Sequence, residues 1–136
     1  MKEFLWPVRI YYEDTDSGGV VYHTNYLKYL ERTRTELLRS FGFEQDQLKQ
    51  QDNIIFAVRA INVDYLKPAR FNDQLMVGAT IGRIGPASIQ FSQSITRETD
   101  SSLICQAEVK IACLTADSLR PCPIPEKITR EISHAD

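Results

Sequence analysis

Residues 21–42 read VYHTNYLKYLERTRTELLRSFG, and this stretch decides the fold. Its apolar side chains recur every three or four residues, at Tyr26, Leu27, Leu30, Leu37, Leu38 and Phe41. That interval places them on one face of a helix, with charged residues on the other face. Gly42 follows the last apolar position, and a glycine is common where a helix ends. The pattern predicts one long helix over about residues 21–41.

Beyond this helix the apolar residues alternate with a period of two, which is typical of half-buried strands. The alternation covers residues 54–65, 75–81, 89–95 and 103–113. Gly85-Pro86 and residues 99–102 are short, turn-forming connections that suit antiparallel hairpins. A polar stretch at residues 44–51 predicts a short second helix.

The two ends complete the predicted domain. Residues 7–12, which start with Pro7, predict a first strand, and turn-forming residues 13–19 follow it. A proline-rich tail from about residue 121 ends the regular structure, with room for a helical turn after Glu126. The order predicts one α+β domain over residues 1–136, with a five-stranded antiparallel sheet. Because one helix leaves the sheet edges bare, we expect self-association.

Composition excludes several classes of protein. The chain has 136 residues, 43% hydrophobic and 25% charged, which is typical of a globular domain. A net charge of -2 disfavours nucleic acid as the partner. No apolar run approaches the roughly 18 residues of a membrane span. The apolar stretch Phe4-Leu5-Trp6 is shorter than the about 7–15 residues of a secretory signal, so we expect a cytoplasmic protein.

The three cysteines predict neither a disulfide framework nor a metal site. Cys105 and Cys113 are eight residues apart in one predicted strand, which separates them by about 27 Å. Cys122 stands between two prolines, and the chain has no C-x-x-C pair. We expect reduced and mostly buried thiols, no metal and no cofactor.

The glycine-containing loop before the long helix carries two carboxylates, Asp14 and Asp16. Three interpretations compete. The residues can stabilise a turn and a helix start. They also resemble the opening of a calcium loop, but Gly18 stands where an oxygen ligand is needed and Asn25 where a bidentate Glu is needed. Finally, a carboxylate next to a helix N-terminus can activate water or attack a carbonyl whose oxygen the helix polarises.

A resemblance favours the catalytic interpretation. Residues 11–26 (YYEDTDSGGVVYHTNY) resemble the signature of the hotdog-fold acyl-CoA thioesterases of the 4-hydroxybenzoyl-CoA thioesterase class. They are most similar to the YbgC branch, which is associated with the Tol-Pal system. Residues 65–73 (YLKPARFND) and 32–36 (RTRTE) fit the same branch, and the likeness covers roughly residues 6–125.

The resemblance implies a long helix wrapped by a curved five-stranded antiparallel sheet. It implies homodimers formed edge to edge, often dimers of dimers (homotetramers), with active sites between subunits. Asp16 would be the catalytic carboxylate, as general base or nucleophile. The backbone N–H of His23, with Tyr22 nearby, would hold the thioester carbonyl, and Asn25 would bind substrate or stabilise the loop.

Other polar residues have both structural and functional interpretations. The His23 side chain can orient Asp16 or the substrate, or it can have a packing role, and Asp14 fits a turn-stabilising role. Arg70 and Asp73 are expected to hold the turn between two strands. Arg59, Lys67 and Arg83 are candidate contacts for coenzyme A phosphates, although exposed cations are usually only solvated.

The predicted activity is hydrolysis of an acyl-CoA thioester, or of the same acyl group on acyl carrier protein. The chain contains no G-x-S-x-G motif, which disfavours a serine-triad hydrolase. Two alternatives remain. One is a hotdog hydratase or dehydratase acting on carrier-bound acyl groups, and the other is a non-catalytic acyl-binding adaptor.

Overall fold

The computed structural model describes residues 2–133 and contains one five-stranded sheet. Its strands are β1 (Phe4–Arg9), β2 (Ile54–Tyr65), β3 (Gln74–Ile84), β4 (Ser88–Arg97) and β5 (Leu103–Thr115). The spatial order is β1-β3-β4-β5-β2, and every neighbouring pair is antiparallel. The α+β class and the antiparallel sheet are therefore confirmed, and β1 and β2 form the two edges.

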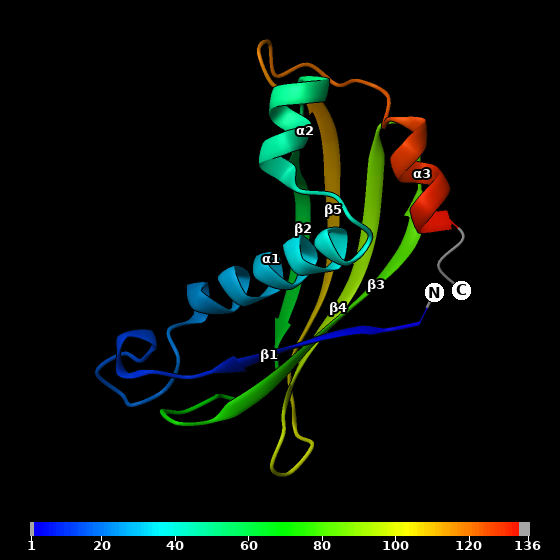
Figure 1. The fold of residues 1–136 in the computed structure, drawn as a ribbon. Coiled ribbons are helices and arrows are strands. Elements are labelled where there is room, and N and C mark those ends of the chain that lie inside the picture. Colours follow the sequence, from blue (N-terminus) through cyan, green and yellow to red (C-terminus); the bar gives the residue numbers. More distant parts are fainter. Residues whose placement is uncertain (1, 134–136) are drawn as a thin grey trace.

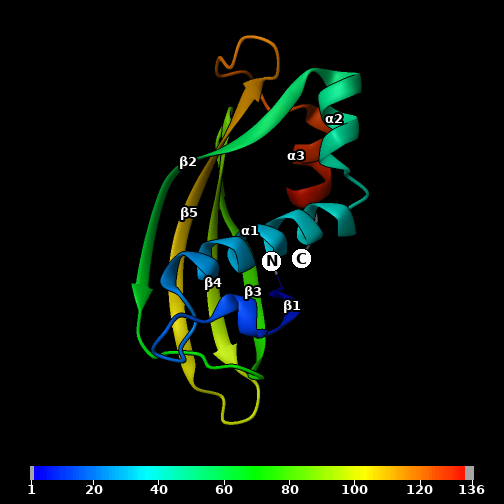
Figure 2. The ribbon, with the colours of Figure 1, turned by 90° about the vertical axis from the view of Figure 1, so that its left-hand side faces the viewer.

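Three helices lie on one side of the curved sheet, as Figures 1 and 2 show. They are α1 (His23–Ser40), α2 (Gln45–Asp52) and α3 (Glu126–Ser133). The long helix α1 crosses the concave face, while α2 and α3 cover the end of the sheet opposite the β4–β5 hairpin. This is the predicted helix wrapped by a sheet, with α2 and α3 at the predicted places. No helix within residues 2–133 is both long and apolar enough to cross a bilayer.

The predicted bounds of the first strand were wrong. It covers Phe4–Arg9, whereas the sequence pattern indicated residues 7–12. Pro7 stands inside β1, which is tolerated because β1 is an edge strand and needs no outward N–H donor. The chain then leaves the sheet in a short 3-10 turn, Tyr12–Asp14, whose Asp14 carboxylate accepts a hydrogen bond from the Tyr11 N–H at 2.8 Å.

Helix α1 starts two residues later than predicted, because Val21 and Tyr22 are extended and bonded elsewhere. The Val21 N–H donates to the Ala69 carbonyl (2.8 Å) and the Tyr22 N–H to the Asp14 carbonyl (2.9 Å). The predicted end at Gly42 is confirmed. Gly42 has a φ of 91°, and its N–H donates to the Arg39 carbonyl at 2.8 Å, which closes the helix.

The core lies between α1 and the concave face of the sheet. The inward residues of β3, β4 and β5 are buried as the alternation predicted: Leu75, Val77, Ala79, Ile81, Ile89, Phe91, Ile95, Cys105, Ala107, Val109, Ile111 and Cys113. They pack against the apolar stripe of α1, which includes Tyr26, Leu30 and Leu37. Edge strand β2 is mostly exposed, so the alternation of apolar residues in its sequence does not correspond to one buried face.

Candidate active site

The loop before α1 is a tight turn that holds Asp16 at the surface. The Asp16 N–H donates to the Val20 carbonyl (2.9 Å), and the Gly19 N–H donates to the Asp16 carbonyl (3.0 Å). Gly19 has a φ of 80°, a conformation that only glycine adopts readily. The Asp16 Oδ1 accepts a hydrogen bond from the Gly18 N–H at 2.8 Å. The turn therefore orients an exposed carboxylate whose Oδ2 has no hydrogen-bond partner within residues 2–133.

A second loop, residues 66–73, supports the first. The Val21 N–H donates to the Ala69 carbonyl (2.8 Å), and Val20 forms an isolated antiparallel bridge with Arg70. The Ala69 N–H in turn donates to the Tyr26 hydroxyl of α1 at 3.0 Å. Ala69 is fully buried, so this small network fixes the loop before α1 to α1 itself.

Asn25 joins the first turn of α1 to the start of the loop. Its Nδ2 donates to the Asp14 carbonyl at 2.9 Å, and the Tyr22 N–H donates to the same carbonyl. The structure therefore gives Asn25 a loop-stabilising contact. The Asp14 carboxylate accepts a hydrogen bond from the Tyr11 N–H, three residues earlier, which agrees with the predicted turn-stabilising role.

The N-terminus of α1 presents unused backbone donors. Tyr22 occupies the N-cap position without capping the helix through its side chain. The N–H groups of His23 and Thr24 have no hydrogen-bond acceptor within residues 2–133. Because the helix dipole adds partial positive charge there, these donors form a site for a carbonyl oxygen or an oxyanion.

A cavity of about 240 Å³ opens beside this helix end. Its lining residues are Val21, His23, Tyr26, Tyr65, Leu66, Lys67 and Pro68. The His23 ring lies 4.7 Å from the exposed Tyr22 ring and 6.0 Å, edge on, from the Tyr65 ring (centroid distances). The structure thus places His23 in the cavity wall with the Tyr22 ring against it, whereas neither Tyr22 nor Asp16 is among the residues that line the cavity.

A larger, mostly apolar groove of about 430 Å³ lies between α1 and β2. It is lined on α1 by residues that include Leu27, Glu31 and Leu38, and on β2 by Phe56, Val58 and Ile61. Leu27, the first groove residue on α1, is one helical turn beyond His23 and on the same face, about 6 Å further along the helix axis. The groove extends to Leu38, about 22 Å from His23 along the helix axis at 1.5 Å per residue.

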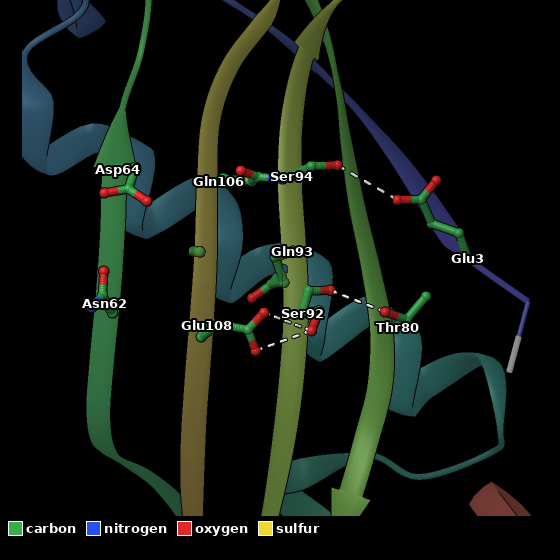
Figure 3. Close-up of a pocket in the computed structure, with 10 residues that line it drawn as sticks. Glu3, Asn62, Asp64, Thr80, Ser92, Gln93, Ser94, Gln106 and Glu108 are labelled. Carbon is green, nitrogen blue, oxygen red and sulfur yellow. Dashed lines mark hydrogen bonds between the residues drawn. The ribbon is translucent and has the colours of Figure 1, made fainter.

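The outward face of the sheet has different chemistry. A cavity of about 410 Å³ there is lined by polar side chains, among them Glu3, Asp64 and Glu108 (Figure 3). The Glu108 carboxylate accepts from the Ser92 hydroxyl at 2.8 Å. Carboxylates repel phosphates and this surface offers little apolar contact, so it fits neither part of an acyl-CoA.

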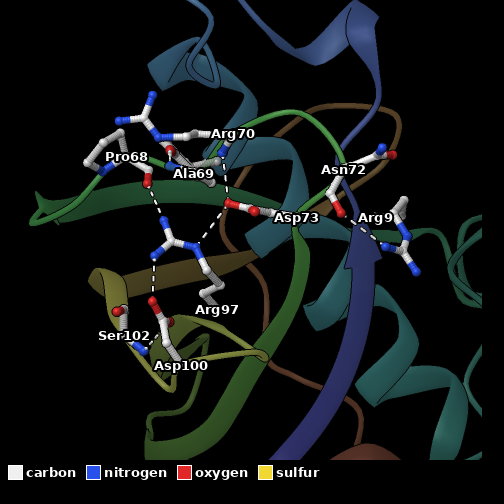
Figure 4. A network of polar contacts seen from close by, with 10 residues as sticks. Arg9, Pro68, Ala69, Arg70, Asn72, Asp73, Arg97, Asp100 and Ser102 are labelled. Carbon is white, nitrogen blue, oxygen red and sulfur yellow. Dashed lines mark hydrogen bonds and ion pairs between the residues drawn. The ribbon is translucent and has the colours of Figure 1, made fainter.

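Figure 4 shows the polar network that holds the second loop. The Asp73 carboxylate accepts from the Arg70 N–H (2.9 Å) and from Arg97 Nε (3.0 Å). The turn-holding role predicted for Asp73 is confirmed, and Arg70 contributes through its backbone. Sequence reasoning missed Arg97, because nothing in the pattern of β4 distinguishes it from a solvated cation.

The candidate phosphate contacts are dispersed. Lys67 lines the cavity at the start of α1, whereas Arg59 borders a separate cavity of about 590 Å³ beside Pro86 and Pro121. Arg83 is exposed near the end of β3. Within residues 2–133, no three metal-ligating side chains come together.

Comparisons with known proteins identify the family. A model of the thioesterase superfamily matches residues 18–104, more than half of the chain. The acyl-CoA thioesterase YbgC of Haemophilus influenzae is 39% identical over 131 residues, which cover 96% of this chain and 95% of the relative.

Solved structures agree with the sequence match. A probable thioesterase from Bartonella henselae is 31% identical, with a TM-score of 0.86 over 91% of this chain and 100% of that chain. A mutant 4-hydroxybenzoyl-CoA thioesterase, complexed with 4-hydroxybenzoyl-CoA, has the same fold at 19% identity. Its TM-score is 0.91 over 97% of this chain and 99% of that chain. The hotdog architecture is therefore confirmed. The chain belongs to the thioesterase superfamily, and within it to the branch of the YbgC acyl-CoA thioesterases.

Proposed function

We propose that this protein hydrolyses an acyl-CoA thioester to the free acid and coenzyme A, with Asp16 and the N-terminus of α1 as the catalytic parts. The observation that carries the proposal is the pair of unbonded N–H groups, at His23 and Thr24, directly after the turn that orients Asp16. Family membership supplies the reaction class.

The reaction needs two functions that this arrangement supplies. Attack on the thioester carbonyl turns its oxygen into an oxyanion, which the His23 N–H and the dipole of α1 stabilise. Asp16 either removes a proton from the attacking water or attacks the carbonyl itself, in which case water then releases the acid. In both cases the carbon–sulfur bond breaks, and the thiol of coenzyme A leaves with a proton.

The acyl group fits the apolar groove between α1 and β2. An acyl chain bound with its carbonyl at His23 can extend along Leu27 toward Leu38. Lys67 lines the cavity beside the same helix end, so its ammonium group would lie near the arm that carries the acyl group. The acyl donor is coenzyme A or acyl carrier protein, and both present a similar flexible arm.

A second copy of the chain completes the site in this proposal. Edge strand β2 carries exposed apolar side chains at Val58 (50% exposed) and Ile61 (39%), which line the groove, and at Tyr65 (46%), which lines the cavity at the start of α1. Pairing of this edge with another copy would bury them and close the groove. It also accounts for the position of Asp16 outside the cavity of a single chain. A dimer, or a dimer of dimers, is therefore part of the proposal.

The decisive experiment measures thiol release from short, long and aromatic acyl-CoAs by wild type, Asp16→Asn, Asp14→Asn and Glu13→Gln. Glu13 is exposed and lies in the same loop region, so Glu13→Gln controls for the loss of one negative charge. We expect full activity from Glu13→Gln and a loss of about a hundredfold or more from Asp16→Asn in a folded protein.

Other outcomes point to other functions. If Asp14→Asn abolishes turnover while Asp16→Asn does not, the catalytic residue has been assigned wrongly. Addition of water to an enoyl thioester without thiol release would indicate a hydratase. Binding of intact acyl-CoA without turnover, unchanged in Asp16→Asn, would indicate an adaptor.

A further inference from the structure

The tail that follows β5 turns back and runs antiparallel beside it. Pro121 forms an isolated antiparallel bridge with Leu114, and the Cys122 N–H donates to the Cys113 carbonyl at 3.0 Å. This pairing places two free thiols side by side, with a Sγ–Sγ distance of 3.6 Å. The end of β5 and the tail that follows it lie at the end of the sheet next to α2, away from the loop before α1 (Figure 1).

We propose that Cys113 and Cys122 form a dithiol site that a two-electron oxidant, such as hydrogen peroxide, converts into an intramolecular disulfide. A disulfide requires a sulfur–sulfur distance of about 2.05 Å and Cβ atoms about 3.5–4.5 Å apart. Residues that face each other on antiparallel strands have Cβ atoms about 4.5–5.5 Å apart. The bond therefore forms by side-chain rotation and a small movement of the tail.

The third cysteine is no competitor for this bond. Cys105 is eight residues from Cys113 on the same strand, so about 27 Å separates the two. It is also fully buried. Only Cys122 lies within reach of Cys113, and the sequence did not reveal this pair because the return of the tail is a tertiary feature.

Exposure sets the order of the reaction. Cys122 is half-buried and reaches solvent, whereas Cys113 is fully buried. Burial, and then the contact with Cys122, raises the pKa of the Cys113 thiol to about 12, so Cys113 remains protonated at neutral pH. Peroxide therefore meets Cys122 first, forming a sulfenic acid and one water. The Cys113 sulfur then attacks the Cys122 sulfur, the Cys113 proton passes to the departing hydroxide of the sulfenic acid, and a second water leaves.

The new bond would fasten the C-terminal helix to the sheet. Cys122 lies four residues before α3, and the Ile124 N–H donates to the Pro86 carbonyl at 2.9 Å. Ile128 and Ile132 of α3 are buried in the core. A covalent link between β5 and the residue that leads into α3 shortens the segment that can detach, which reduces the local opening of α3.

The test treats the reduced protein with hydrogen peroxide, then alkylates it under denaturing conditions and measures its intact mass. We expect wild type to lose two hydrogens, to keep one alkylatable cysteine of its three, and to yield a Cys113–Cys122 cross-linked peptide. Dithiothreitol should restore all three thiols. Hydrogen exchange of α3 should slow in the oxidised protein and return to its original rate on reduction.

Matched variants separate this bond from general oxidation. Cys105→Ser should form the disulfide as wild type does, and Cys122→Ser should form no intramolecular disulfide. The proposal is overturned if all three wild-type thiols remain alkylatable, or if Cys122 proceeds to sulfinic acid with Cys113 still free. It is also overturned if Cys122→Ser still yields an intramolecular disulfide.

Discussion

Arg97 and Asp73 form an ion pair that joins β4 to the loop supporting the candidate active site, with an Nε–Oδ2 distance of 3.0 Å. Arg97 also donates through Nη2 to the Pro68 carbonyl (2.6 Å) and through Nη1 to Asp100 Oδ2 (3.1 Å). The hydrogen bond to Asp73 contributes most to raising the pKa of Arg97. The Arg97 guanidinium therefore contacts the residue before Ala69 directly, through the Pro68 carbonyl, and the residue after it through Asp73, which accepts from the Arg70 N–H. The Ala69 carbonyl between them accepts from the Val21 N–H.

Arg97→Ala should lower both stability and turnover. The Pro68 carbonyl loses its donor and the partly buried Asp73 carboxylate keeps only the Arg70 N–H, which costs about 1–3 kcal/mol in the free energy of unfolding. We expect kcat to fall several-fold because the loop before α1 loses its support, and Arg97→Lys to be intermediate because an ammonium cannot reproduce the planar fork. Urea unfolding and steady-state kinetics check this, with the exposed Lys49→Ala as control. Wild-type kinetics in Arg97→Ala would contradict it.

Two neighbouring tyrosines should respond differently to loss of the hydroxyl. Tyr26 Oη accepts from the buried Ala69 N–H at 3.0 Å, so Tyr26→Phe leaves that donor unpaired and costs about 1–3 kcal/mol. Tyr29 Oη is the one buried side-chain polar atom within residues 2–133 without a hydrogen-bond partner. Tyr29→Phe should therefore be neutral or stabilising. Urea midpoints at neutral pH check both variants, and equal destabilisation would refute the difference.

Alkaline pH should destabilise the fold through Tyr29. Burial, followed by the neighbouring Asp14 carboxylate, raises the pKa of the Tyr29 phenol above the value of about 10 in an unfolded chain. The stabilisation is fully present below pH of about 10. Above that, the unfolded chain loses its proton first, so the free energy of unfolding falls as pH rises. Urea midpoints between pH of about 9 and 11 should fall less steeply in Tyr29→Phe than in wild type; parallel curves would count against the assignment.

A buried arginine in α1 depends on one amide. Arg34 Nη1 donates to Gln93 Oε1 (3.0 Å), and Gln93 Nε2 donates to the Leu30 carbonyl (3.1 Å). Arg34 is 7% exposed, and burial lowers its pKa. No carboxylate within residues 2–133 lies within ion-pair distance of Arg34.

Arg34→Met should therefore destabilise the protein by about 1–3 kcal/mol, because Gln93 Oε1 is left buried and unpaired. The double variant Arg34→Met/Gln93→Leu should recover most of that loss, since both polar partners become apolar. Unfolding free energies of the four proteins in this cycle give the coupling between the two positions. Strictly additive effects would contradict it.

Local patterns were sufficient to predict most elements. The period of α1 and the stop at Gly42 follow from backbone geometry, and the alternation in β3, β4 and β5 follows from burial of one sheet face. Those constraints act within a few residues. The pattern misplaced β1, where an edge strand tolerates Pro7. It gave the bounds of β2 correctly, although exposure on both faces of that edge strand leaves no alternation of burial.

The sequence by itself determined the α+β class, the antiparallel strands and the loop that carries Asp16, because each depends on short-range sterics and hydrophobic period. Only the tertiary structure decided which distant groups meet. It placed Ala69 between Val21 and Tyr26, joined Arg97 to Asp73, and brought Cys122 to Cys113. Such contacts depend on how strands and loops far apart in the chain pack around one core, and no local pattern encodes that packing.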